Sequence, residues 1–288
     1  MQQSNTRKLV ESALMIALAT VLSLVKLADL PYGGSVTLAS MLPIILISYR
    51  NGLGWGLGTG LAYAVLQQLL GLKNLTYVTG APSVIAVIFL DYLLAFTVIG
   101  LAGMFRRVIR DQGASLAAGT GVVCVLRYIC HVIAGATVWA GLSIPTAGAI
   151  GYSLIYNATY MIPETIVTVL AAYYIGSLVD FREEQLKRIT RPVSGNTTTA
   201  LLGGGAALLI VAGLIYDVVS VFANLQDGET GEFNITLLGD AGVYFWIRIA
   251  VVTVIVVAAA VTLLLIRRMV ATKNTASEEP KGDDSFDA

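Results

Sequence analysis

Apolar residues are grouped along the chain into eight long runs, which are separated by short polar stretches. A helix that crosses a membrane needs about 20 consecutive apolar residues, and most of these runs approach that length. The second run is shorter, so the loop before it could enter the membrane only where protein or a cavity satisfies its backbone. We therefore predict eight hydrophobic helices, at about residues 9–27, 38–49, 53–70, 83–105, 115–142, 149–179, 200–223 and 242–266.

The predicted helices fall into two groups, because a charged and polar stretch follows the sixth. This pattern predicts an all-α integral membrane protein with a six-helix bundle and a C-terminal two-helix transmembrane hairpin. The linker between them could hold an interfacial helix, and the tail has the composition of a disordered segment. The expected divisions are a membrane domain at 1–180, a cytoplasmic linker at 181–199, the two-helix hairpin at 200–270 and the polar tail at 271–288.

Composition agrees with a membrane protein and excludes several functions. The chain is 56% hydrophobic and 12% charged, with a mean hydropathy of +0.78. Soluble domains carry about 25% charged residues. The sequence contains no Walker A motif, so we do not expect the chain to hydrolyse ATP by that route. With one histidine, a His-based metal site is not expected. Cys124 and Cys130 point about 120° apart on one helix, so neither a metal site nor a local disulfide is expected from them.

Glycines repeat every four residues at the start of the third predicted helix, at Gly52, Gly56 and Gly60. A phosphate-binding loop is the alternative interpretation. No Lys-Ser or Lys-Thr pair follows, and the stretch lies in an apolar helix. The repeat therefore favours close helix packing.

The distribution of basic residues predicts the orientation in the membrane, because cytoplasmic loops carry an excess of Lys and Arg. With the N-terminus inside, all but four of the 18 Lys and Arg residues fall on the inner side. The four exceptions are Lys26, Lys73, Arg127 and Arg248. Both termini are therefore expected in the cytoplasm, with outward-facing loops at 28–37, 71–82 and 143–148.

A stripe of unusual residues lies in the fifth predicted helix. Four-residue steps drift only about 40° around an α-helix, so Arg127, His131, Gly135 and Trp139 share one slanting face. The stripe is ionisable at one end, small in the middle and aromatic at the other, which suggests an intramembrane ligand pocket. The alternative is a packing seam whose histidine bonds to a neighbouring helix.

Asp91 is an ionisable residue in the fourth predicted helix, roughly 13 Å from its outer end. An unpaired carboxylate in lipid costs at least about 2.5 kcal/mol, so a cationic partner is expected. The candidates are a protonated His131, a bound ligand, or an internal bridge to Arg127. Asp91 and the stripe together predict a site for a cationic, aromatic ligand, because aromatic faces attract a cation and a carboxylate neutralises it.

Other polar and aromatic residues are expected at the same outer level. Tyr152 and Asn157 lie in the first turns of the sixth helix, near the level of Trp139. Tyr77, in the loop before the fourth helix, could equally belong to an interfacial belt of aromatic residues. On the first helix, Ala13 and Ala17 form a small-xxx-small pair, which permits docking of another helix or internal packing.

These residues resemble the thiamine-binding S-component of energy-coupling-factor (ECF) vitamin transporters. The resemblance covers about residues 7–180, the whole six-helix unit. Its motifs are Asp91-Tyr92 in the run Phe89 to Thr97, the pattern His131-x3-Gly135-x3-Trp139, Tyr152 with Asn157, and Gly33-Gly34-Ser35-Val36-Thr37 before Met41-Leu42-Pro43.

The resemblance implies a non-enzymatic protein of the bacterial cell membrane that binds thiamine from outside with high affinity. In such a site Trp139 would stack on an aromatic ring of the vitamin, His131 would face the thiazolium, and Asp91 would balance its charge. The other implied pocket residues are Tyr92, Gly135, Tyr152 and Asn157, with Gly34 and Tyr77 as further candidates.

The resemblance also implies partner proteins. Ala13 and Ala17 would dock the ECF transmembrane coupling subunit, which carries two ATPase subunits. ATP would be used by those partners, so no cofactor is expected in this chain, and no nucleic-acid partner is expected. The last two helices lie outside the six-helix unit of the family.

Two positions depart from the family pattern. Asp91 replaces a glutamate, and Gly34 aligns with a tryptophan for which Tyr32 could substitute. An alternative function is a self-sufficient secondary transporter, in which Asp91 and Glu164 would be proton or sodium sites. Glu164 lies seven residues beyond Asn157, so it would either join the pocket or pair with a basic residue.

Overall fold

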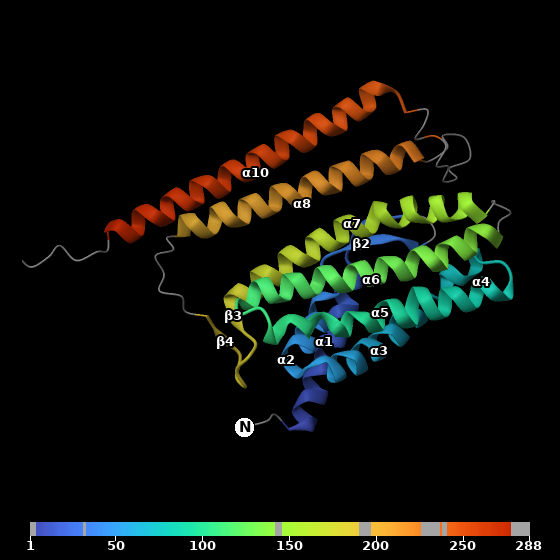
Figure 1. Cartoon of the computed structure of the whole chain (residues 1–288), viewed down its shortest axis with the longest axis horizontal. Coiled ribbons are helices and arrows are strands. Elements are labelled where there is room, and N and C mark those ends of the chain that lie inside the picture. The colour runs from blue at the N-terminus through green and yellow to red at the C-terminus, as the bar shows by residue number, and fades with distance from the viewer. Residues whose placement is uncertain are drawn as a thin grey trace, which may run out of the picture. The chain divides into compact units, whose positions relative to one another are not determined.

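The computed structural model describes residues 4–30, 33–141, 146–189, 197–225, 237 and 241–277 (Figure 1). The described chain is mostly helical, as the hydrophobic pattern predicts. Its contacts divide it into two units, residues 1–189 with 218–240, and residues 190–217 with 241–288. Among the described residues, five helical spans are long and apolar enough to cross a membrane: Ala81–Arg107, Gln112–Val138, Gly148–Leu178, Leu201–Leu225 and Val243–Thr272.

The first unit begins with α1 (Asn5–Leu24), which is capped by the Ser4 side chain. A two-stranded antiparallel hairpin follows, formed by β1 (Lys26–Asp29) and β2 (Ser35–Thr37). The first helix thus ends at Leu24 instead of about 27, and the predicted loop at 28–37 contains part of a β-hairpin. Residues 26–29 satisfy their backbone groups against a second strand, a pairing that the helical hydrophobic pattern does not reveal.

Helices α2 (Leu42–Asn51) and α3 (Leu53–Leu70) are separated by Gly52 alone. Gly52 has a φ of +92°, which glycine adopts without the steric cost of a side chain. The other two glycines of the repeat, Gly56 and Gly60, have a different role from Gly52. Gly56 and Gly60 are buried, and a Cβ on either would lie within 3 Å of backbone atoms of Gly100 or Thr97. Close helix packing thus occurs at Gly56 and Gly60, whereas Gly52 is a turn residue.

The predicted fourth helix is one continuous span with changing geometry. After the 3₁₀ segment η2 (Leu72–Tyr77), the span contains α4 (Ala81–Ala86), the π-helix η3 (Val87–Leu94), α5 (Ala95–Thr97) and the 3₁₀ segment η4 (Val98–Arg107). A π-helix closes its hydrogen bonds over five residues instead of four, and such turns occur frequently at functional sites. Here the π-helix carries Asp91 and Tyr92.

Helices α6 (Gln112–Gly141) and α7 (Thr146–Leu178) pack extensively against each other. The bundle core around them includes the fully buried side chains of Tyr49, Tyr63 and Leu116. The predicted helices at 115–142 and 149–179 correspond to this pair, although the structure extends both toward their N-termini.

A second small hairpin, β3 (Val179–Asp180) with β4 (Lys187–Arg188), follows α7. Arg50 donates to the carbonyls of Glu183 and Glu184 at 2.8 and 2.5 Å, and it pairs with Glu11 at 3.0 Å. Residues 181–189 of the predicted linker therefore belong to a hairpin tied to α1 and α2 instead of an interfacial helix, and residues 197–199 are the start of α8 (Thr197–Leu225). Residues 190–196 of that linker lie outside the described chain.

The second unit is built from α8 (Thr197–Leu225) up to Asp217 and from α10 (Val243–Ser277). The two segments run antiparallel, because Gly213 lies against Val256 and Thr253 donates to Asp217 at 2.8 Å. Helix α10 continues past the predicted end at 266 to Ser277. The first residues of the predicted disordered tail are therefore helical, and residues 278–288 lie outside the described chain.

Candidate functional site

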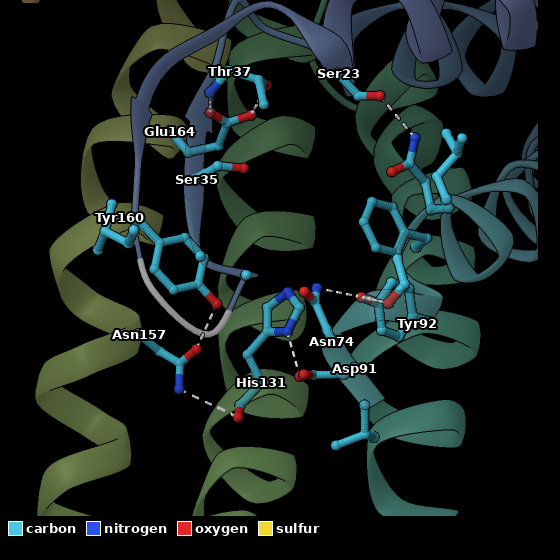
Figure 2. A pocket seen from close by; sticks show the side chains of 18 of the residues that line it. Ser23, Ser35, Thr37, Asn74, Asp91, Tyr92, His131, Asn157, Tyr160 and Glu164 are labelled. Atoms are coloured by element: carbon cyan, nitrogen blue, oxygen red, sulfur yellow. Dashed lines mark hydrogen bonds and ion pairs between the residues drawn. The ribbon is translucent and has the colours of Figure 1, made fainter. Parts of the chain in front are cut away.

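A cavity of about 500 Å³ lies inside the first unit (Figure 2). Its walls come from the β1–β2 hairpin, the end of α1, and α3, η2, η3, α5, α6 and α7. This volume is in the range of pockets that hold small organic ligands. Its lining includes three carboxylates, Asp29, Asp91 and Glu164, of which Asp29 pairs with Lys26. It also includes the aromatic side chains of Tyr63, Tyr77, Tyr92, Phe96, Tyr156 and Tyr160.

Asp91 and His131 form a close pair on the cavity wall. Asp91 Oδ1 lies 2.6 Å from His131 Nδ1, and the two residues come from η3 and α6 (Figure 2). His131 is buried, and within the described structure its Nε2 has no hydrogen-bond partner. Of the partners that the sequence left open for Asp91, the structure thus pairs it with His131, whose second imidazole nitrogen is buried without a partner.

Arg127 does not bridge to Asp91, so the alternative of an internal Asp91–Arg127 pair is wrong. Its guanidinium lies 4.3 Å from the centre of the Phe96 ring, and its Nη1 is 3.0 Å from the sulfur of Met41. Arg127 is one turn of α6 away from His131 and also lines the cavity. The aromatic ring and the sulfur hold the cation in a separate part of the wall.

Asn157 and Tyr160 form a hydrogen-bonded set around His131. The Asn157 amide donates to the backbone carbonyls of His131 at 3.3 Å and Ser153 at 2.8 Å, and its Oδ1 accepts from Tyr160 at 2.6 Å. The Tyr160 ring contacts the His131 ring edge-on, with centroids 6.2 Å apart. These bonds join α7 to α6 at the level of the Asp91–His131 pair and fix the orientation of the Asn157 and Tyr160 side chains.

Tyr92 is held on the opposite wall. Its hydroxyl accepts from the Asn74 amide at 2.8 Å and donates to the Gly71 carbonyl at 3.3 Å. Its ring stacks on that of Phe96, with centroids 6.2 Å apart. The segment after α3 thus fixes the position of the Tyr92 side chain. Tyr92 directly follows Asp91 in the π-helix.

The β1–β2 hairpin supplies a wall of the cavity and is bonded to α7 at two points. The Gly34 amide donates to the Tyr156 hydroxyl at 3.1 Å, and a Cβ at Gly34 would lie 2.7 Å from the Tyr160 ring. Thr37 donates to the Glu164 carboxylate through both its amide and its hydroxyl. Gly34 lacks a side chain where the hairpin backbone approaches these two tyrosines.

The cavity brings together most of the residues that the sequence suggested. Asp91, Tyr92, His131, Gly135 and Asn157 line it, as do the further candidates Gly34 and Tyr77.

Two of the suggested aromatic residues are not placed on the cavity wall. Tyr152 is buried in a hydrophobic cluster with Leu30 and Val36 and does not line the cavity. The backbone of Trp139 belongs to α6, but its side chain lies outside the described structure, as does Tyr32.

Sequence reasoning missed several lining residues, among them Tyr156, Tyr160, Asn74 and Thr37. Tyr152, Tyr156, Tyr160 and Glu164 follow one another at four-residue steps on α7. The same spacing argument that selected the stripe on α6 would therefore have selected Tyr156 and Tyr160. Asn74 carries no comparable signal, because only the folded chain brings it to the cavity. Thr37 belongs to a motif of the family resemblance, but its spacing does not connect it with Glu164.

No group of three or more His, Cys, Asp or Glu side chains that could hold a metal ion occurs in the described part of the chain. The site is instead a polar and aromatic cavity with a carboxylate–imidazole pair. Such a cavity suits an organic cation.

Comparison with known proteins identifies the family. A family model described as thiamine transporter protein (Thia_YuaJ) matches residues 9–180, more than half of the chain. The thiamine transporter ThiT of Bacillus subtilis (strain 168) is 37% identical over 177 residues, which are 58% of this chain and 88% of that protein. A solved structure of ThiT from Listeria monocytogenes, 24% identical, covers 60% of this chain and 95% of its own, with a TM-score of 0.49. The family match shows that this chain belongs to the thiamine transporter protein family.

Proposed function

We propose that this protein is the substrate-binding membrane subunit, or S-component, of an ECF importer and that thiamine binds in the cavity. One observation carries the proposal: a member of the thiamine transporter family has a carboxylate–imidazole pair, Asp91 with His131, on the wall of a cavity between apolar helices. Thiamine contains a permanently charged thiazolium ring and an aminopyrimidine ring. The cavity offers a counter-charge for the first and aromatic faces for both.

Asp91 would act as the counter-ion of the thiazolium. A neutral His131 that donates its Nδ1 proton to Asp91 keeps the pair at a net charge of −1. In this tautomer His131 Nε2 is an acceptor, and in the described structure it is buried and has no partner. An ionised carboxylate in a site shielded from water attracts a cation more strongly than it would in water.

Aromatic side chains would supply the remaining attraction. Tyr92 and Tyr160 are held beside the Asp91–His131 pair by hydrogen bonds to Asn74 and Asn157. Each ring that faces the cation adds about 0.5–2 kcal/mol. Trp139, on the same stripe as His131 and Gly135, is predicted to stack on one ring of the vitamin.

A surface on α1 suits a partner in the membrane. Ala13 and Ala17 are exposed on α1, together with the apolar side chains of Leu9, Leu14 and Leu18. Small residues at this spacing allow another helix to approach closely. We propose that this face docks the ECF coupling subunit, whose two ATPases use ATP on the cytoplasmic side, where both termini of this chain would also lie.

The proposal is tested by calorimetric titration of the purified protein with thiamine and, separately, with other vitamins. Saturable heat with thiamine alone is expected. Heat with a different vitamin, and none with thiamine, would be consistent with a vitamin transporter but would refute thiamine as its substrate. Uptake into vesicles is expected to need the coupling subunit and the ATPases. Accumulation driven by a proton gradient in this chain alone would instead favour a secondary transporter, which the comparisons do not support.

A further inference from the structure

We infer that Glu164 is a positioning residue that holds β2 against α7 and thereby sets how long thiamine stays bound. The inference rests on the proposed function, because it concerns the same cavity. It assigns a role to a carboxylate that is separate from the Asp91–His131 pair. Glu164 is seven residues from Asn157 along α7, roughly 10 Å, and Figure 2 shows it toward the other end of the cavity from Asp91.

The contact between Glu164 and Thr37 is bidentate. One carboxylate oxygen accepts from the Thr37 amide at 2.5 Å, and the other accepts from the Thr37 hydroxyl at 2.7 Å. The Thr37 hydroxyl also lies 2.8 Å from Ser40 Oγ. Glu164 is only 2% exposed. Both of its oxygens are thus bonded to a single residue of the hairpin.

Burial makes this contact matter for the position of the hairpin. A buried carboxylate needs hydrogen bonds or an opposite charge, and its bonds are stronger than those between neutral groups. Arg127, on the neighbouring helix, interacts electrostatically with Glu164, but its guanidinium contacts Phe96 and Met41. If β2 moved away from α7, Glu164 would therefore lose two donors at once.

The hairpin forms one wall of the cavity, so its attachment affects the ligand. Asp29, Gly34, Ser35 and Thr37 all line the cavity. A second polar tie between this hairpin and α7 is the bond from the Gly34 amide to the Tyr156 hydroxyl. Weakening the Glu164–Thr37 contact should therefore loosen this wall while leaving the Asp91–His131 pair in place.

The test measures dissociation of radiolabelled thiamine after a chase with unlabelled thiamine. Thr37→Val removes the hydroxyl and keeps the shape, and it should raise the dissociation rate about tenfold or more. Thr37→Ser keeps the hydroxyl and should restore a near-native rate. Thr120→Val is the matched control, because the Thr120 hydroxyl is also buried but bonds within α6, to Leu116.

Hydrogen exchange of the ligand-free protein supplies a readout that general destabilisation would not reproduce. Thr37→Val and Glu164→Gln should each accelerate exchange at residues 33–37 and leave α6 unchanged. Thiamine should dissociate from their double variant no faster than from the faster single variant, since both substitutions weaken the same Glu164–Thr37 contact. A native dissociation rate in Thr37→Val, additive effects, or faster exchange throughout the bundle would overturn the inference. Failure of the proposed function would look different, because the unmodified protein would then show no saturable thiamine binding.

Discussion

Asp91 Oδ1 lies 2.6 Å from His131 Nδ1, although the two residues belong to different membrane helices. The contact depends on the π-helix η3, which carries Asp91, and on α7, whose Asn157 bonds to the His131 backbone. A carboxylate that is held by an imidazole and faces a cavity has its charge fixed in place before a ligand arrives. Preorganisation of this kind reduces the cost of binding.

Tyr160→Phe should weaken thiamine binding about tenfold without unfolding the protein. The change removes the 2.6 Å bond to Asn157 and leaves a ring of the same shape. Asn157 would then have an unsatisfied buried oxygen, which costs about 1–3 kcal/mol. Calorimetric titration of the variant checks the affinity, and Tyr173→Phe, a partly exposed tyrosine on the same helix, is the control. Equal affinities for Tyr160→Phe and the unmodified protein would contradict this role.

Gly100→Val should destabilise the bundle by about 1–3 kcal/mol through overpacking. An added Cβ at Gly100 would lie 2.3 Å from backbone atoms of Gly56 in α3, a distance that forces the two helices apart. Gly58→Val is the comparison, because nothing lies within 4 Å of a Cβ there. Thermal unfolding, monitored by size-exclusion chromatography in detergent, measures the difference in stability between the two variants. Similar unfolding temperatures for the two variants would count against close packing at Gly100.

Bulky residues on α1 should separate binding from transport. Ala13→Trp or Ala17→Trp is expected to abolish thiamine uptake by the assembled transporter while the purified protein binds thiamine normally, because both side chains are exposed and neither lines the cavity. Ala62→Trp, on an exposed position of α3, should leave uptake intact. Normal uptake in the α1 variants would refute docking of the coupling subunit at this face.

The hydrophobic pattern predicted much of the fold, because apolar runs of about 20 residues have few alternatives to helices in a membrane. It did not predict the β1–β2 hairpin, since Lys26–Asp29 becomes a strand only through its partner Ser35–Thr37. Nor did it predict the π-helix, because an extra residue in a turn leaves little trace in an apolar sequence. The hydrophobic pattern carries no information about which segments, distant in the sequence, pair with each other.

The candidate site was only partly predictable for the same reason. His131 and Gly135 were found from their spacing on one helix, and Asp91 from the cost of its charge in lipid. Whether Asp91 would meet Arg127 or His131 could not be decided, because both lay within plausible reach along α6. Thr37 became part of the site only through its bonds to Glu164 on α7.

The central claim is that Asp91 recognises the positive charge of thiamine. The most direct measurement compares the affinities of thiamine and of an uncharged analogue of the same shape, in the unmodified protein and in Asp91→Asn. The unmodified protein should prefer thiamine, and Asp91→Asn should weaken thiamine by about tenfold to a hundredfold while changing the affinity for the analogue much less. Equal weakening of both ligands would show that Asp91 supports the structure of the site without recognising the charge.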